Sequence, residues 1–250
     1  MKVAIAGAGG RMGQALIEGV LADRELSLAL ALDVVGAGTA VGGTKITSDL
    51  GEIAKADVLI DFTRPAGTLG HLKHARSMVI GTTGFSKSQI ETIEETAKRI
   101  PIVMAANFAV GVNAAYKLVD LAARILGDAY DVEIIEAHHR HKVDAPSGTA
   151  LRLGEIIAVA LKRDLKKEAR HGRQGDTGER PKKQIGFHSI RGGDIVGEHT
   201  VIFAGAGERV EVTVRSQSRA TYAAGALRAA KWLKGRPAGL YDMADVLGLK

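Results

Sequence analysis

Residues 2–13 read KVAIAGAGGRMG, a short apolar run that leads into four glycines. The run from Val3 to Ala6 predicts a strand, and the apolar residues between positions 16 and 21 recur at helical spacing. A strand, a glycine turn and a helix in this order predict a dinucleotide site, because glycines let the backbone approach a pyrophosphate at the helix N-terminus. Met12 stands where the usual fingerprint has its third glycine, and Gly13 follows one place later. The candidate cofactor residues of this turn are Gly7, Ala8, Gly9, Gly10, Arg11 and Met12.

A second strand is predicted from the leucines that alternate between Leu26 and Leu32, and it ends at Asp33. An acid at this place accepts hydrogen bonds from ribose hydroxyls, although a strand-end aspartate can also simply cap a turn. The glycine turn upstream favours the nucleotide. Because Asp33 would repel a 2′-phosphate and Val34 supplies no cation, NADH is the predicted cofactor. NADPH stays possible if Arg11 reaches the phosphate.

Three further apolar runs predict strands at residues 58–60, 78–80 and 102–104, each followed by a polar or glycine-bearing loop. Helical patterns lie between and after them, including residues 86–99 with Ser86 as the cap. This alternation predicts an α/β fold with a parallel, Rossmann-like sheet, whose loops gather at the carboxyl ends of the strands.

The most chemically dense stretch is residues 136–149, EAHHRHKVDAPSGT. Val132, Ile134 and Ile135 predict a strand before it, and a period of two would place His138, Arg140 and Lys142 on one face and the other two histidines on the opposite face. His138 and Lys142 would then reach the same ligand.

Apolar residues at helical spacing between positions 151 and 161 predict a helix that begins near Ser147. The N–H groups of Gly148 and Thr149 at such a start favour a carboxylate or phosphate. The alternative is a solvated cationic rim. Zinc is disfavoured because adjacent histidines on a strand diverge and the neighbouring cations repel the ion, so the sequence predicts no metal site.

The pattern changes near residue 110. After a predicted helix over 111–126 and the stretch just described, short strands are predicted at residues 184–191, 198–204 and 209–216, with glycine turns between them. Consecutive hairpins would make this sheet antiparallel. The expected second domain is therefore α+β with a mixed or antiparallel sheet, and a last helix covers residues 222–233.

Composition narrows the function classes. The chain of 250 residues has no cysteine, which excludes disulfides and thiolate chemistry and is compatible with the predicted cytoplasmic location. No apolar run reaches membrane-spanning length. The net charge of +6 arises largely between Lys162 and Lys183, where nine Lys or Arg face four Asp or Glu. With 4% aromatic residues and no nucleic-acid motif, this segment predicts a solvated loop and no nucleic-acid partner.

The stretch EAHHRHKVDAPSGTA closely resembles the signature of the dihydrodipicolinate reductase family. The resemblance extends over nearly the whole chain, through GAGGRMG, DFTRPAGT, IGTTGF, AANFAVGVN, GERPKKQIGFHSIRGGDIVGEHT and the last thirty residues. It implies reduction of a small cyclic dicarboxylate, 4-hydroxy-tetrahydrodipicolinate, to tetrahydrodipicolinate with loss of water, in the diaminopimelate route to lysine. The alternatives are another two-domain dehydrogenase of small amino or keto acids and a non-catalytic dinucleotide sensor.

The resemblance also implies roles for residues. His138 and Lys142 occupy the positions of the acid chemistry, and His139, Gly148 and Thr149, with Ser147 beside them, those of the substrate contacts. Two strand exits face the nicotinamide in the family, and they correspond here to Gly81, Thr82, Thr83, Ala105, Ala106, Asn107 and Phe108. Residues 1–109 with 219–250 would form the dinucleotide-binding domain, and residues 110–218 the substrate-binding domain, which assembles a homotetramer.

Overall fold

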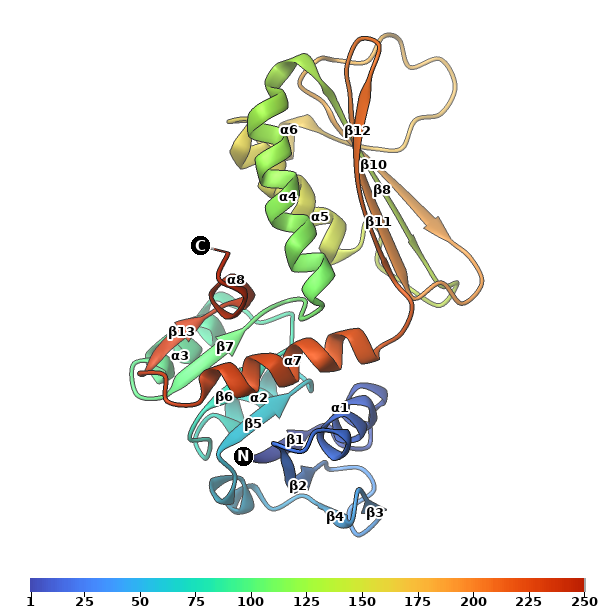
Figure 1. Ribbon diagram of the computed structural model, residues 1–250. Helices are drawn as coiled ribbons and strands as arrows, with labels where there is room; N and C mark the ends of the chain where they lie inside the picture. Colours follow the sequence, from blue (N-terminus) through green and yellow to red (C-terminus); the bar gives the residue numbers. More distant parts are fainter. Residues whose placement is uncertain (250) are drawn as a thin grey trace. The chain divides into compact units, whose positions relative to one another are not determined.

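The computed structural model describes residues 1–249 and divides the chain into two compact units (Figure 1). The first consists of Met1–Val110 and the segment from Arg219 onward, and the second is Gly111–Ser218. Each unit has its own sheet and its own apolar core.

The first unit is built on an eight-stranded sheet in the order β13-β7-β6-β5-β1-β2-β4-β3. Every pairing in it is parallel except that between the two short strands β3 and β4. The strands are β1 (Lys2–Ala6), β2 (Ser27–Leu32), β3 (Ala40–Val41), β4 (Thr44–Thr47), β5 (Val58–Asp61), β6 (Met78–Ile80), β7 (Pro101–Met104) and β13 (Gly239–Tyr241). The predicted parallel α/β sheet is therefore confirmed.

The strands of this sheet are apolar on both sides, and helices cover both faces and remove these apolar side chains from water. Val3 and Ile5 of β1 face α1 (Arg11–Ala22) and α7 (Ala220–Leu233), whereas Ala4 and Ala6 belong to the core that includes η1 (Leu50–Lys55) and α3 (Lys87–Ala97). The remaining helices are α2 (Pro65–His71) and α8 (Met243–Leu247). Ser86 caps α3 with a complete capping box, as its sequence predicts.

The register of the central strands aligns their carboxyl ends. Ala6 pairs with Leu32 on one side and Asp61 on the other, Asp61 pairs with Ile80, and Ile80 pairs with Met104. The loops that leave these strands therefore emerge along one edge of the sheet, which is where an open parallel sheet binds its ligand.

The second unit has a five-stranded sheet in the order β12-β11-β8-β10-β9, with α4 and α5 on one face (Figure 1). Its elements are α4 (Val110–Leu126), η2 (Gly127–Ala129), β8 (Asp131–His138), α5 (Gly148–Ala160), α6 (Leu165–Glu168), β9 (Ala169–His171), β10 (Ile185–Arg191), β11 (Gly197–Ala204) and β12 (Arg209–Ser216). Strands β8, β10, β11 and β12 match the prediction, and β9 is additional. The mixed sheet that was one of the two expected arrangements is confirmed, whereas the arrangement as consecutive hairpins is wrong. β8 lies between β10 and β11 and pairs parallel with the first and antiparallel with the second, so the sheet is mixed.

The basic segment between Lys162 and Lys183 is only in part the solvated loop that its charge predicts. Residues 172–183 form a largely exposed loop, but several arginines of the segment are bound to acids. The Arg163 side chain is 1% exposed and bonds Asp128 at 2.6 Å. Arg173 and Arg180 both bond Glu133 of β8, the central strand of the sheet. Charge counting missed this because the acidic partners lie well before the segment in the chain. Among residues 1–249, no helix combines the length and apolarity needed to cross a membrane.

Candidate active site

The glycine turn of the first unit is shaped by close backbone approach. Gly7 has φ of +78°, a conformation that favours glycine, and a Cβ on Gly13 would lie 2.1 Å from the Gly7 carbonyl oxygen. Gly13 thus fulfils the packing role of the fingerprint glycine one position late. No side chain caps α1, whose N-cap is Gly10, so its first N–H groups are left for an anion.

Asp33 is held against this turn. Its carboxylate accepts hydrogen bonds from the Gly9 and Val35 N–H groups, each at 3.0 Å. A carboxylate oxygen has more than one acceptor site, so ribose hydroxyls can still bond to it. Val34 beside it is 86% exposed.

A cavity of about 340 Å³ lies at the turn, lined by Gly7, Gly10, Arg11, Met12, Gly13, Phe62, Arg219 and Tyr222. Arg11 and Arg219 bring two cations to it, which suits the two negative charges of a pyrophosphate. Arg219 and Tyr222 were not among the predicted cofactor residues, because they follow the second unit in the chain. A pyrophosphate therefore fits the residues present.

In the two predicted nicotinamide loops, the side chains of Thr82 and Phe108 are buried within the first unit. Phe108 is 1% exposed and packs on Phe62 at 5.6 Å between ring centroids, and a Cβ on Gly81 would meet that same Phe62 ring. The Thr82 hydroxyl is buried and bonds Thr68. Thr83 and Ala106 are exposed, and Gly81, Ala105 and Asn107 are half-buried.

A buried polar network below these loops was also missed. The carboxylate of Asp61, which is fully buried at the end of β5, accepts from the Thr63 hydroxyl at 2.6 Å and contacts His71 Nδ1 at 2.7 Å. Thr82 donates to it at 3.3 Å. Asp61 thereby ties the exits of β5 and β6 to helix α2. The only sequence signal was its place at a strand end.

In the second unit, the predicted alternation over residues 138–142 is wrong. β8 ends at His138, and the Lys142 N–H donates to the His139 carbonyl at 3.1 Å, which closes a turn. Arg140 donates its N–H to the Gly193 carbonyl at 3.2 Å, and this contact draws the chain away from the strand direction. The turn nevertheless keeps the Lys142 charge close enough to act on the His138 pKa.

Glu136 is the buried centre of the site, with 1% of its side chain exposed. Arg191 donates to both carboxylate oxygens at 2.7 and 2.8 Å, His138 Nδ1 contacts it at 2.6 Å, and the Ser147 N–H donates at 3.2 Å. Burial would raise the pKa of Glu136, but these bonds from Arg191 and His138, together with one from Ser189, hold the pKa at about 2.

The two buried histidines of the site have lowered pKa values. Burial lowers the pKa of His138, and the charges of Lys142 and Arg191 act in the same direction against Glu136. Burial and the neighbouring His138 lower the pKa of His199 to about 4. The rings lie edge to face, 5.1 Å apart. Both imidazoles are therefore neutral near pH 7.

The helix start offers an open place beside these groups. Ser147 caps α5, with its hydroxyl accepting from the Ala150 N–H and contacting His199 Nε2 at 2.9 Å, so this side chain is occupied. A Cβ on Gly148 would meet nothing within 4 Å, which leaves room for a ligand against the backbone. Thr149 follows in the first turn of the helix. His139 Nδ1 is buried without a hydrogen-bond partner among residues 1–249, as a ligand-binding nitrogen would be.

The sequence analysis gave no role to Glu136, Arg191 or His199. Arg191 pairs in register with His138, and His199 with Glu136, so the sheet brings three separate segments to one level. All three residues lie within the segments that resemble the reductase family, which was their only signal. Among residues 1–249, no three His, Asp or Glu side chains are grouped to hold a metal ion.

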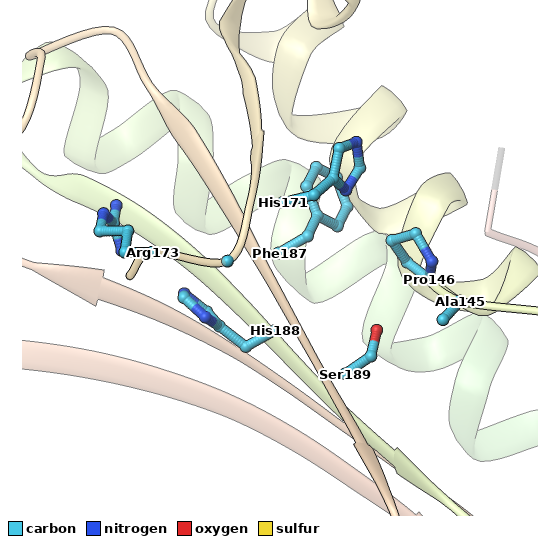
Figure 2. A pocket seen from close by; sticks show the side chains of 8 residues that line it. Ala145, Pro146, His171, Arg173, Phe187, His188 and Ser189 are labelled. Atoms are coloured by element: carbon cyan, nitrogen blue, oxygen red, sulfur yellow. The ribbon is translucent and has the colours of Figure 1, made fainter. Parts of the chain in front are cut away.

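A second cavity, of about 400 Å³, is lined in part by Ala145 and Pro146 (Figure 2). His171 stacks on Phe187 at 5.2 Å within it, and Arg173 and His188 line it. Both of these groups bond the Glu133 carboxylate, at 2.7 Å each. Arg173 and His188 are thus both engaged with a carboxylate of the protein itself.

A nucleotide-binding parallel sheet and a separate unit with an anion-accepting helix start define a dinucleotide-dependent oxidoreductase of small acids. Two family models match the chain: the N-terminal part of dihydrodipicolinate reductase over residues 1–108 and its C-terminal part over residues 111–247. The chain belongs to the dihydrodipicolinate reductase family.

Relatives of known name agree over the full length. The 4-hydroxy-tetrahydrodipicolinate reductases of Aromatoleum aromaticum and Cupriavidus necator are 58% and 57% identical over 100% of this chain, and the matches cover 96% and 100% of those proteins. A dipicolinate-bound dihydrodipicolinate reductase from Paenisporosarcina sp. TG-14 has 26% identity and a TM-score of 0.79, with 98% of each chain covered. The homotetramer and the cytoplasmic location stay predictions.

Removing the Glu133 carboxylate should weaken the second unit in a pH-dependent way. Burial would raise its pKa, but Arg173, Arg180 and His188 lower the pKa from 4.5 to about 2. The stabilisation is therefore fully present above about pH 4.5 and is lost as the pH falls toward 2. The shift corresponds to roughly 3 kcal/mol. We expect Glu133→Gln to lower the free energy of unfolding at pH 7, with a smaller difference from the parent at pH 2.5, in urea titrations. Glu211→Gln, at an exposed pair, is the control and should change little.

Proposed function

We propose that this chain reduces 4-hydroxy-tetrahydrodipicolinate to tetrahydrodipicolinate and water, with a nicotinamide dinucleotide as hydride donor. The observation that carries the proposal is that the second unit contains both the His138–Lys142 turn and the open helix start at Gly148. The chain also matches such reductases over its full length. Fold alone would not identify the substrate.

The second unit supplies contacts for a dianionic substrate. The open space at Gly148 accommodates one carboxylate at the start of α5, and the unpartnered Nδ1 of His139 offers a further donor. Lys142 adds a positive charge, with its ammonium bonded to Asp144 at 2.7 Å. Charge-assisted bonds of this kind both attract and orient a carboxylate.

The reaction consumes one hydride and one proton and releases water. When bound, the dinucleotide supplies the hydride; the proton must come from the chain. Lys142 Nζ donates a hydrogen bond to Asp144 and so has protons to give, whereas the lowered pKa of His138 favours its neutral imidazole. Lys142 is thus the better donor, and His138 is placed to exchange protons beside it.

Loss of either titratable group should slow the reaction. We expect Lys142→Ala and His138→Ala each to lower kcat by about 10² to 10⁴, the usual effect of removing a proton-transfer group. Binding of NADH should stay within a factor of two or so, because both residues belong to the second unit. The check is NADH absorbance with freshly made substrate, and parent-like turnover in both variants would refute the assignment.

The helix start can be tested with dipicolinate, a flat dicarboxylate. We expect competitive inhibition in the parent, and Gly148→Ala should weaken dipicolinate binding roughly tenfold to a hundredfold, since a methyl group would occupy the open place where a carboxylate meets the backbone. The fold should tolerate this change. Gly111→Ala, in the first turn of α4 with only an ordinary contact to Val214, is the matched control. Equal affinity of the two variants by calorimetry would place the substrate elsewhere.

The cofactor preference follows from Asp33. Its carboxylate, fixed by two N–H groups, favours free ribose hydroxyls and repels a 2′-phosphate, and the exposed Val34 beside it carries no charge. We expect a higher kcat/KM with NADH than with NADPH, and Val34→Arg should move the ratio toward NADPH by about tenfold. Val35→Arg, next along the same exposed loop, serves as the control for charge alone. A parent enzyme that prefers NADPH would contradict this assignment.

A further inference from the structure

Both candidate proton-transfer groups of the second unit are connected to one buried ion pair. The Arg191 guanidinium that grips Glu136 also donates to the Asp144 carbonyl oxygen at 2.6 Å. The Asp144 carboxylate in turn accepts from Lys142 Nζ at 2.7 Å. Glu136 itself contacts His138 Nδ1 at 2.6 Å. His138 and Lys142, which come from a strand end and a turn, thus share a single support.

We propose that Glu136 and Arg191 are positioning residues for proton transfer: Glu136 fixes the tautomer and the ring orientation of His138, and Arg191 fixes the Asp144 segment that holds Lys142. The proposal deepens the reductase function proposed above and rests on it for its kinetic consequences. Its structural content, the tautomer of His138, can be measured without any substrate.

Arg191 determines whether Glu136 is ionised, and therefore whether it accepts a hydrogen bond from His138 or donates one to it. A carboxylate that is 1% exposed would take up a proton if it lacked a cationic partner, and it would then donate to Nδ1. With the two bonds from Arg191 it stays ionised and can only accept. Neutral His138 must then carry its proton on Nδ1, and Nε2 is left as an acceptor. Nε2 has no hydrogen-bond partner among residues 1–249, so this is the nitrogen available to a ligand.

The groups that surround His138 come from every packed element. Glu136 lies on the same strand, Arg191 on β10, His199 on β11 and Lys142 on the turn. Glu136 is the only one of these four that raises the His138 pKa. Removing its charge while keeping its shape should therefore lower the pKa of His138 further, in addition to releasing the ring.

The same strand provides a matched control. Glu133, on the opposite face of β8, is also bound by arginines and contacts a histidine, His188, at 2.7 Å. Replacing it by glutamine removes a comparable buried pair of the same unit without touching the support of His138. A purely structural role for Glu136 would make the two glutamine variants behave alike.

The experiment compares Glu136→Gln, Arg191→Lys and Glu133→Gln with the parent. In the parent, nitrogen NMR of labelled histidine should show His138 with its proton on Nδ1. In Glu136→Gln we expect this tautomer preference to weaken and the pH midpoint of His138 to fall. We also expect a kcat loss of roughly 10- to 100-fold, as for other partners that orient functional histidines. Arg191→Lys should lower kcat similarly, with dipicolinate and NADH affinities within about threefold of the parent.

Glu133→Gln should keep the parent kcat, pH profile and His138 signals even if it unfolds more easily. A parent His138 protonated on Nε2, an unshifted midpoint in Glu136→Gln, or an equal loss of kcat in Glu133→Gln would each overturn the positioning role. Failure of the reductase function itself would look different, since the parent would then show no turnover while its His138 tautomer remained measurable.

Discussion

The second unit depends on the burial of one carboxylate. Removing an ion from water costs several kcal/mol, so Glu136 can remain charged inside the unit only because Arg191 meets it with two hydrogen bonds and His138 and the Ser147 N–H complete its contacts. These partners come from β10, the end of β8 and the start of α5. One buried charge therefore requires three elements to meet at one level, and their meeting point is where the chemistry of the site lies.

Strand β8 carries a second carboxylate that is bound by arginines and a histidine, and it lies on the opposite face of the strand. Glu133 binds Arg173, Arg180 and His188, and a Cβ on Gly186 would lie 1.8 Å from its carboxylate, so a side chain on the neighbouring strand would displace this carboxylate. Here the result is structural, since the arginines fasten the segment after β9 to the sheet. The two histidines differ in the ring nitrogen that contacts the carboxylate. His188 contacts Glu133 through Nε2, whereas His138 contacts Glu136 through Nδ1, so that its Nε2 remains for a ligand.

The sequence predicted most strands and the glycine turn, because apolar periodicity and glycine spacing are local properties. The predictions failed where contacts with residues far away in the chain determine the local structure. The charged run after His138 fits an alternating strand and a turn equally well, and the choice is made by backbone bonds to Gly192 and Gly193 more than fifty residues later. Likewise, the basic segment looked solvated because its acidic partners Asp128, Asp131 and Glu133 precede it by tens of residues. Periodicity and local charge carry no information about such contacts.

The hairpin predicted between residues 184–191 and 198–204 is absent, because β10 pairs with β8, and this long-range pairing also explains why the role of Arg191 was missed. In the observed parallel register Ile185 lies beside Val132 and Arg191 beside His138, so the carboxyl ends of both strands coincide. In an antiparallel pairing over the same residues, Arg191 would lie beside Val132 instead, six residues from His138. At about 3.3 Å per residue this is roughly 20 Å, too far for the arginine to reach Glu136 and the Asp144 carbonyl together. Parallel strands bring their exits to one edge, and this rule, which gathers the candidate cofactor loops of the first unit, therefore also assembles the candidate acid–base site of the second.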